Sequence, residues 1–117
     1  MTKSDRLGVF EQLILLALVR LGTNAYGMTI RREIESRTGQ STSLGAVYIT
    51  LDRLERKGYV RSHDGSPAAE RQWRARRFFQ IEPPGEHALI QALDAVDRMR
   101  AGVPRAGRLS PAPEVSG

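Results

Sequence analysis

The side chains of this chain that are suited to chemistry are mainly arginines, and they concentrate in one stretch. Residues 61 to 77 hold five arginines against two carboxylates, namely Arg61, Arg71, Arg74, Arg76 and Arg77 with Asp64 and Glu70. Guanidinium groups at this density suit phosphate, because each carries a permanent positive charge and several N–H donors. The chain of 117 residues has 18 Lys plus Arg against 13 Asp plus Glu, a formal charge of +5. That charge favours an anionic partner without distinguishing nucleic acid from a membrane.

A second candidate site is the stretch just before the arginines, SLGAVYITLDRLERKGYV at residues 43–60. At 100° per residue its apolar side chains form one stripe, made of Leu44, Val47, Leu51 and Leu54. The opposite side carries Gly45, Ala46 and Ile49 before it reaches Arg53 and Arg56. Small residues there let the backbone lie close to another surface. We therefore predict one helix with a core face and a ligand face, with Ser43 as its N-cap and Gly58 at its end.

Enzymatic chemistry has almost no support in the sequence. The chain has no cysteine, which excludes disulfides, thiolate metal sites and cysteine nucleophiles. His63 and His87 lie too far apart to suggest a paired metal site, and no nucleophile–base set or glycine-rich phosphate loop is present. We therefore expect no enzymatic activity, no cofactor and no metal.

The location of the protein can be predicted from its apolar runs and its first residues. The apolar run at residues 13–19 is far shorter than the roughly 18 residues of a membrane span. The first residues carry mixed charge and do not resemble a signal peptide. We expect a cytoplasmic protein without a membrane partner.

The periodicities predict a mainly α fold with a small β hairpin. We expect helices over 7–21, 25–38, 44–57 and 86–100, and strands over 59–63 and 74–81. Thr23 or Asn24 would cap the second helix and Gly39 would end it. In the hairpin, Phe79 and Ile81 would anchor the base in the core. The predicted units are a flexible N-terminus at 1–6, a winged helix domain at 7–82, a dimerisation helix at 83–100 and a disordered tail at 101–117.

The predicted fold is a winged helix-turn-helix, since two helices joined by a short turn are followed by an arginine-bearing hairpin. We predict double-stranded DNA as its ligand. Ala46 and Ile49 suit contact with thymine methyl groups, while Ser43, Thr50 and Arg53 could hydrogen-bond to bases or phosphates. On the wing we expect contacts from Arg71, Arg74 and Arg76. Trp73 could stack on the DNA sugar or pack under the wing, and packing is favoured.

A resemblance to a known family is carried by the stretches LGVFEQLILLALVRL, GAVYITLDRLERKGYV and RRFFQIEPPGEHAL. Through them, residues 7–100 resemble the PadR family of bacterial transcriptional regulators. The resemblance implies a homodimeric repressor on a palindromic operator, with Tyr48 as a DNA contact. A packed aromatic role for Tyr48 remains the alternative. Some members of that family bind aromatic or drug-like molecules between subunits, so the resemblance allows a small-molecule effector at the dimer interface. The sequence itself indicates no ligand pocket, since Phe10 is the only aromatic residue on either dimer helix. Where the family has Leu-Thr before the last helix, this chain has prolines at positions 83 and 84.

The apolar pattern independently predicts a homodimer. The first helix is apolar around most of its circumference, and the last helix carries a stripe at three- and four-residue spacing. Packing these surfaces between two chains would cover both. The expected interface residues are Phe10, Leu15, Leu16, Val19, Leu89, Leu93, Val96 and Met99. The alternative is that the last helix folds back onto its own chain.

Two other functions remain open. A winged-helix protein-interaction module without sequence-specific DNA binding would use a patch at Ala46 and Ile49, which is small. An RNA binder would show more stacking aromatics than Trp73 and Phe78. The remaining charges should form ion pairs on helix surfaces. The acids are Glu33, Glu35, Asp52 and Glu55, and their expected partners are Arg31, Arg32, Arg37 and Arg56.

Overall fold

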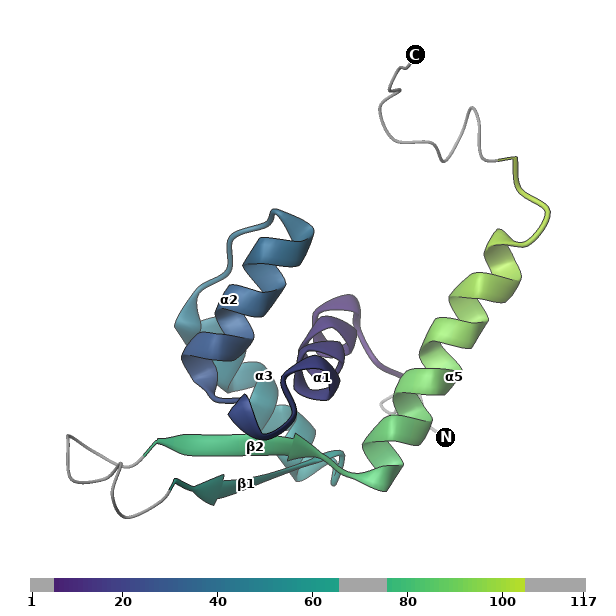
Figure 1. The fold of residues 1–117 in the computed structure, drawn as a ribbon. Helices are drawn as coiled ribbons and strands as arrows, with labels where there is room; N and C mark the ends of the chain where they lie inside the picture. The colour runs from purple at the N-terminus through teal and green to yellow at the C-terminus, as the bar shows by residue number, and fades with distance from the viewer. Residues whose placement is uncertain (1–5, 66–75, 105–117) are drawn as a thin grey trace.

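A computed structural model describes residues 6–65 and 76–104 of the chain (Figure 1). In chain order the elements are α1 Val9–Leu21, the 3-10 helix η2 Gly22–Asn24, α2 Gly27–Thr38, α3 Leu44–Arg56, β1 Val60–Asp64, β2 Arg77–Ile81 and α5 Pro83–Arg100. This is the predicted mainly helical fold with a two-stranded hairpin, arranged as a winged helix-turn-helix. The expected flexible start and disordered tail fall largely outside the described residues.

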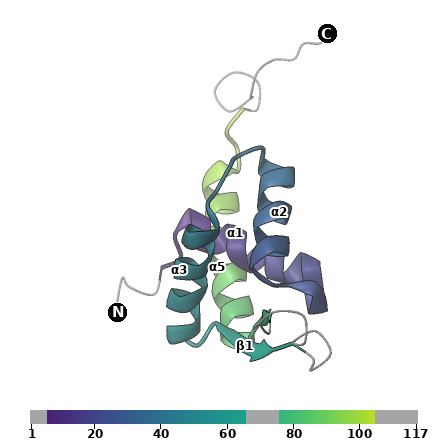
Figure 2. The same ribbon diagram turned by 90° about the vertical axis from the view of Figure 1, so that its left-hand side faces the viewer.

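Helix α1 lies at the centre of the molecule. It packs against α2, α3, α5 and β2, and Figure 2 shows α2 and α3 on opposite sides of it with the hairpin below. Ile14 and Leu15 are fully buried within this one chain. The expectation that Leu15 faces a second chain is therefore wrong, because Leu15 lies in the core of its own chain, whereas Val19 of the expected interface is 55% exposed. Phe10 and Leu16 also pack against this core and remain partly accessible.

The predicted caps of α2 and α3 are confirmed in part. Ser43 Oγ accepts the amide N–H of Ala46 at 3.0 Å, as predicted for the cap of α3. Gly39 and Gly58 take left-handed φ values of 73° and 83° where α2 and α3 end. The predicted cap of α2 is wrong. The residue before this helix is Tyr26, and its N–H is accepted by the hydroxyl of Thr29 at 3.0 Å.

The hairpin is attached to both the core and the start of α2. Val60 of β1 lies opposite Ile81 of β2 in an antiparallel ladder. The outer edge of β2 continues the sheet, because the N–H of Phe79 donates to the carbonyl of Ala25 at 2.9 Å. Phe79 is fully buried and Ile81 partly buried, which confirms the predicted anchor. The described strand begins at Arg77, later than the predicted start at 74, which lies outside the described residues.

An ion pair cluster ties α1 to α2. Glu33 Oε2 accepts hydrogen bonds from the Nε atoms of Arg20 at 2.7 Å and Arg37 at 2.8 Å. The hydrogen bonds from Arg37 and Arg20 hold the pKa of Glu33 below its ordinary value. The link is therefore complete at neutral pH and is lost only as the pH falls through the lowered pKa.

Helix α5 begins at Pro83, three residues before the predicted start, with prolines in its first positions. Its first half packs on the protein's own core, since Leu89 is buried and Ala92 and Leu93 are partly buried. Leu89 is therefore not free to contact a second chain, and the fold-back alternative holds for this half. Every residue from 94 to 100 is exposed, and Figure 1 shows this end of α5 standing clear of the other helices.

None of the helices in the described residues combines the length and the apolar character needed to cross a bilayer.

Gly85 sets the angle at which α5 leaves the sheet. A Cβ at Gly85 would lie 2.3 Å from the carbonyl oxygen of Tyr59, and backbone cannot rotate away. We predict that Gly85→Ala lowers the free energy of unfolding by about 1–3 kcal/mol. Urea denaturation followed by circular dichroism measures this.

The matched control is Gly45→Ala, also in the first turn of a helix, where a Cβ meets nothing closer than Ser43 Oγ at 4.0 Å. We expect this change to be neutral or to stabilise by up to about 1 kcal/mol. Equal losses in the two variants would show that the approach to Tyr59 is not what makes position 85 sensitive.

Candidate nucleic-acid interface

The outward side of α3 carries a line of four exposed residues, Gly45, Ile49, Asp52 and Arg56, which we call the outer ridge. Ile49 exposes 61% of its surface, whereas the opposite side of the helix is fully buried at Val47, Leu51 and Leu54. The predicted division of this helix into two faces is confirmed. An exposed isoleucine beside glycine gives the ridge a shallow, weakly polar profile that another surface can approach closely.

Thr50 is a correction to the predicted contact set. It is only 5% exposed, because its side chain lies on the core side of α3. Its hydroxyl is therefore not available to a ligand. Of the other predicted residues at this end of α3, Ser43 is exposed and Ala46 is partly buried.

Tyr48 is packed on one side and exposed on the other. Its ring lies 6.4 Å from that of Phe79, yet 36% of the residue is exposed. The hydroxyl end rests on Gly27 in the first turn of α2, where an added Cβ would lie 2.3 Å from Tyr48 Oη. Gly27 therefore shapes the seat of Tyr48. The sequence analysis missed it, although a glycine opening a helix after an aromatic residue was an available signal.

Glu11 is the second functional candidate that the sequence analysis missed. Its carboxylate is buried, accepts the N–H of Gly8 at 2.8 Å and lies 3.2 Å from Lys57 Nζ. The Nη1 atom of Arg53 approaches the same oxygen at 3.7 Å. Glu11 thus joins the start of α1 to the last turns of α3 and holds Arg53 on one flank of the outer ridge.

The base of the wing is built on stacked rings. Phe78 contacts Tyr26 edge-on at 5.4 Å between centroids and is stacked by His63 at 5.9 Å. The guanidinium of Arg76 lies 4.5 Å above the Tyr26 ring. Phe78 is thereby packed between neighbours. Arg76 is consequently held beside the first turn of α2, on the wing side of α3.

The arginines of the wing differ in how far they are neutralised. Arg77 pairs with Glu55 at 3.1 Å, and Arg61 pairs with Glu82 at 3.3 Å. Arg76 has no ion pair with any carboxylate that the structure describes. Three residues of interest, Arg71, Trp73 and Arg74, lie outside the described residues.

The expected ion pairs on helix surfaces form only in part. Glu33 pairs with Arg37, and Glu35 pairs with Arg31 at 3.5 Å. Glu55 pairs with Arg77 of the wing instead of an arginine on its own helix. Within residues 6–65 and 76–104, no ion pair involves Asp52, Arg32 or Arg56. Asp52 and Arg56, the two charges of the outer ridge, therefore have no ionic partner in the part of the chain that the structure describes.

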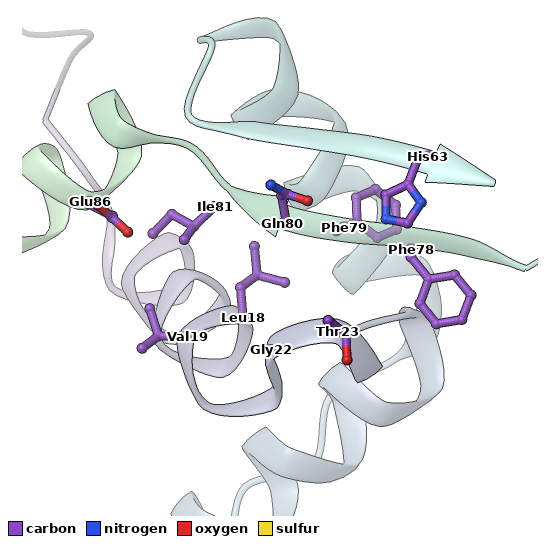
Figure 3. A pocket seen from close by; sticks show the side chains of 10 residues that line it. All are labelled: Leu18, Val19, Gly22, Thr23, His63, Phe78, Phe79, Gln80, Ile81 and Glu86. Atoms are coloured by element: carbon purple, nitrogen blue, oxygen red, sulfur yellow. The ribbon is translucent and has the colours of Figure 1, made fainter. Parts of the chain in front are cut away.

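Two hollows flank the central helix. The first, about 410 Å³, lies between the end of α1 and β2 and is open to solvent (Figure 3). It is lined by Leu18, Val19, Gly22, Thr23, His63, Phe78, Phe79, Gln80, Ile81 and Glu86. The second, a groove of about 770 Å³, runs between the start of α1 and α5. It is lined by Arg6, Leu7, Gln12, Tyr59, Pro84, His87, Ala88, Gln91, Ala92, Ala95 and Val96. No cluster of three metal-ligating side chains occurs in the part of the chain that the structure describes.

The chain matches a known protein family over most of its described residues. The model of the transcriptional regulator PadR-like family matches residues 15–91, which include α2, α3, the wing and the first half of α5. The chain belongs to this family. Its function is therefore the regulation of transcription and not an enzymatic reaction. No curated protein sequence matches the chain.

Solved structures share the fold. A PadR-like transcription factor from Bacteroides fragilis is 19% identical with a TM-score of 0.69, over 80% of this chain and 84% of that one. A PadR family regulator from Clostridium difficile is 21% identical with a TM-score of 0.64, over 80% of this chain and 95% of that one. The ORC1 protein of Aeropyrum pernix, solved in complex with DNA, is 21% identical with a TM-score of 0.62, over 80% of this chain and 26% of that one.

The buried carboxylate of Glu11 gives a prediction for this PadR-like protein. We expect Glu11→Gln to lower the free energy of unfolding by about 1–3 kcal/mol, because Lys57 and Arg53 lose their counter-charge in a partly buried setting. Thermal and urea denaturation at low salt measure the loss. The control is Asp94→Asn, which removes an exposed pair with Arg98 at 3.0 Å and should cost about 0–1 kcal/mol. A loss at Glu11 no larger than at Asp94 would contradict the prediction.

Proposed function

We propose that this PadR-like regulator binds DNA sequence-specifically as a homodimer and represses transcription from a palindromic operator. The observation that carries the proposal is the outer ridge of α3, which stands exposed between Arg53 on one flank and the wing on the other. A helix presented in this way fits the major groove, and a basic wing beside it fits the phosphate backbone. The similar ORC1 structure, described as a complex with DNA, supports the same use of the fold.

The proposed contact set separates base contacts from backbone contacts. Residues facing the bases and the groove wall are Ser43, Ala46, Tyr48 and Ile49. Phosphate contacts come from Arg53 and the wing residues Arg71, Arg74 and Arg76. Thr50 is excluded because it is buried. Lys57 is also less available, because Glu11 neutralises it at 3.2 Å.

The homodimer is proposed from the half of α5 that its own chain leaves bare. Val96 and Met99 continue the stripe of Leu93 and are 51% and 80% exposed. The groove between α5 and the start of α1 has a floor of small residues, Ala88, Ala92 and Ala95. Small side chains allow a second helix to approach closely, so the α5 helix of a second copy is our proposed occupant. A two-fold dimer would then place two α3 helices on half-sites about one DNA turn apart, which a palindrome matches.

Repression is the simpler mode of action for such a dimer. A dimer that covers a promoter needs no contact beyond its operator, whereas activation requires a further surface for polymerase. The proposal places the protein in the cytoplasm, where a bacterial regulator meets its DNA. A small-molecule effector would bind at the dimer interface, in the part of this groove that the α5 helix of the second copy leaves open.

DNA binding is tested by fluorescence anisotropy with the DNA upstream of the protein's own gene. We expect affinity to fall steeply with salt, because phosphate contacts release counterions. Arg53→Ala and Arg76→Ala should each weaken binding and reduce the slope of log affinity against log salt by about 1.

The control for this titration is Arg98→Ala on α5, which removes an equal charge far from α3 and should leave the slope unchanged. Binding no stronger than to random DNA would refute an operator at this site. It would instead favour the alternative, a winged-helix module whose patch at Ala46 and Ile49 meets a protein partner.

The dimer is tested by analytical ultracentrifugation. Met99→Glu places a charge on the bare stripe and should shift the protein towards monomer, with its thermal stability as a monomer unchanged because residue 99 makes no core contact. The matched control is Ile90→Glu, where the residue is 65% exposed but lies off the stripe. Dimers that tolerate Met99→Glu as well as Ile90→Glu would rule out this interface.

A further inference from the structure

An acidic side chain stands in the middle of the surface proposed to meet DNA. Asp52 follows Ile49 by one helical turn on the outer ridge and is exposed. Within the described residues its carboxylate takes part in no ion pair and no side-chain hydrogen bond. Its neighbour Glu55 differs, because Arg77 and Ser62 both donate to it. Asp52 is thus the acid of α3 that has no partner among residues 6–65 and 76–104.

A free carboxylate at a DNA interface is unfavourable unless a base donates a hydrogen bond to it. Phosphates repel it, and most base edges in the major groove present acceptors. Cytosine is the base that suits it best, because its N4 amino group has an acceptor on one side only, the O6 of the paired guanine, whereas the N6 amino group of adenine lies between two acceptors. Adenine offers its N6 donor beside the N7 acceptor, which a carboxylate avoids. Arg53 and Arg56 on the same helix offset the repulsion from the backbone, so Asp52 can approach the groove.

The position of Ile49 fixes what lies next to that cytosine. Residues three apart on a helix have Cβ atoms about 5–6 Å apart, and stacked base pairs are about 3.4 Å apart. The two side chains therefore meet the same or neighbouring base pairs. Ile49 has only apolar surface to offer, and the apolar feature of the major groove is the C5-methyl group of thymine.

We propose that Asp52 is a specificity-determining residue, which accepts a hydrogen bond from a cytosine amino group beside a thymine whose methyl group packs on Ile49. Each operator half-site would then contain a thymine and a cytosine at the same or adjacent steps. This inference rests on the proposed function, since it assumes that the outer ridge enters the major groove. Asp52 would then act by weakening the binding of DNA sequences that lack this cytosine.

The experiment begins with selection of bound duplexes from a randomised pool by the wild-type protein, followed by titration of the best operator. Replacing the critical thymine by deoxyuridine should weaken wild-type binding about 3- to 10-fold, through loss of one buried methyl group. The same replacement should not affect Ile49→Ala. Exchanging the critical C·G pair for T·A should weaken wild-type binding about 5- to 150-fold and leave Asp52→Ala unaffected. Asp52→Ala should also bind random DNA more tightly than the wild type.

The control protein is Ile90→Ala, which removes an equally exposed isoleucine from α5 and should respond to both base changes as the wild type does. If an operator is selected but the base changes affect wild type and variants equally, the inference is overturned while DNA binding stands. If no duplex is enriched and no DNA is bound, both the proposed function and the inference fail.

Discussion

The burial of α1 on several sides is the constraint on which the rest of the structure depends. Ile14, Leu15 and Leu18 give this helix more apolar surface than one neighbour can cover, and α2, α3, β2 and α5 share the task. Because all four pack on one helix, α3, the base of the wing and the start of α5 are fixed relative to one another. A change in how α5 packs on α1 can therefore reach α3 and the wing through a single shared core.

The polar contacts complete that coupling. Glu11 stands at the start of α1, beside the groove that α5 borders, and holds Lys57 and Arg53 at the end of α3. Burying a carboxylate is costly unless it is paired and hydrogen-bonded, so these partners are kept in place. Arg53 is thereby held towards the start of α1. By contrast, Asp52 and Arg56 of the outer ridge have no described partners. The fold therefore fixes Arg53 beside the ridge but not the charged side chains of the ridge itself.

The extent of the PadR-like family match agrees with the way α5 packs. The family match ends within α5 at residue 91, close to where the helix stops packing on its own chain. The winged helix is a self-contained unit up to that point. The remaining turns of α5 leave Val96 and Met99 exposed. This apolar surface supports the proposed homodimer, because methionine and valine on a regular stripe gain stability when they are covered.

The sequence by itself determined the elements and their local signals. Helical and strand periodicity gave the order of helices and the hairpin, while Ser43, Gly39 and Gly58 marked helix ends because capping depends on neighbouring residues alone. The anchor at Phe79 followed from alternation along one strand. Only the tertiary structure decided which helix would be central, and hence that Leu15, Thr50 and Leu89 are buried and Glu11 is enclosed. Periodicity identifies the most apolar face of a helix, but the number of neighbours that cover its other faces is set by long-range packing, which no short stretch of sequence encodes.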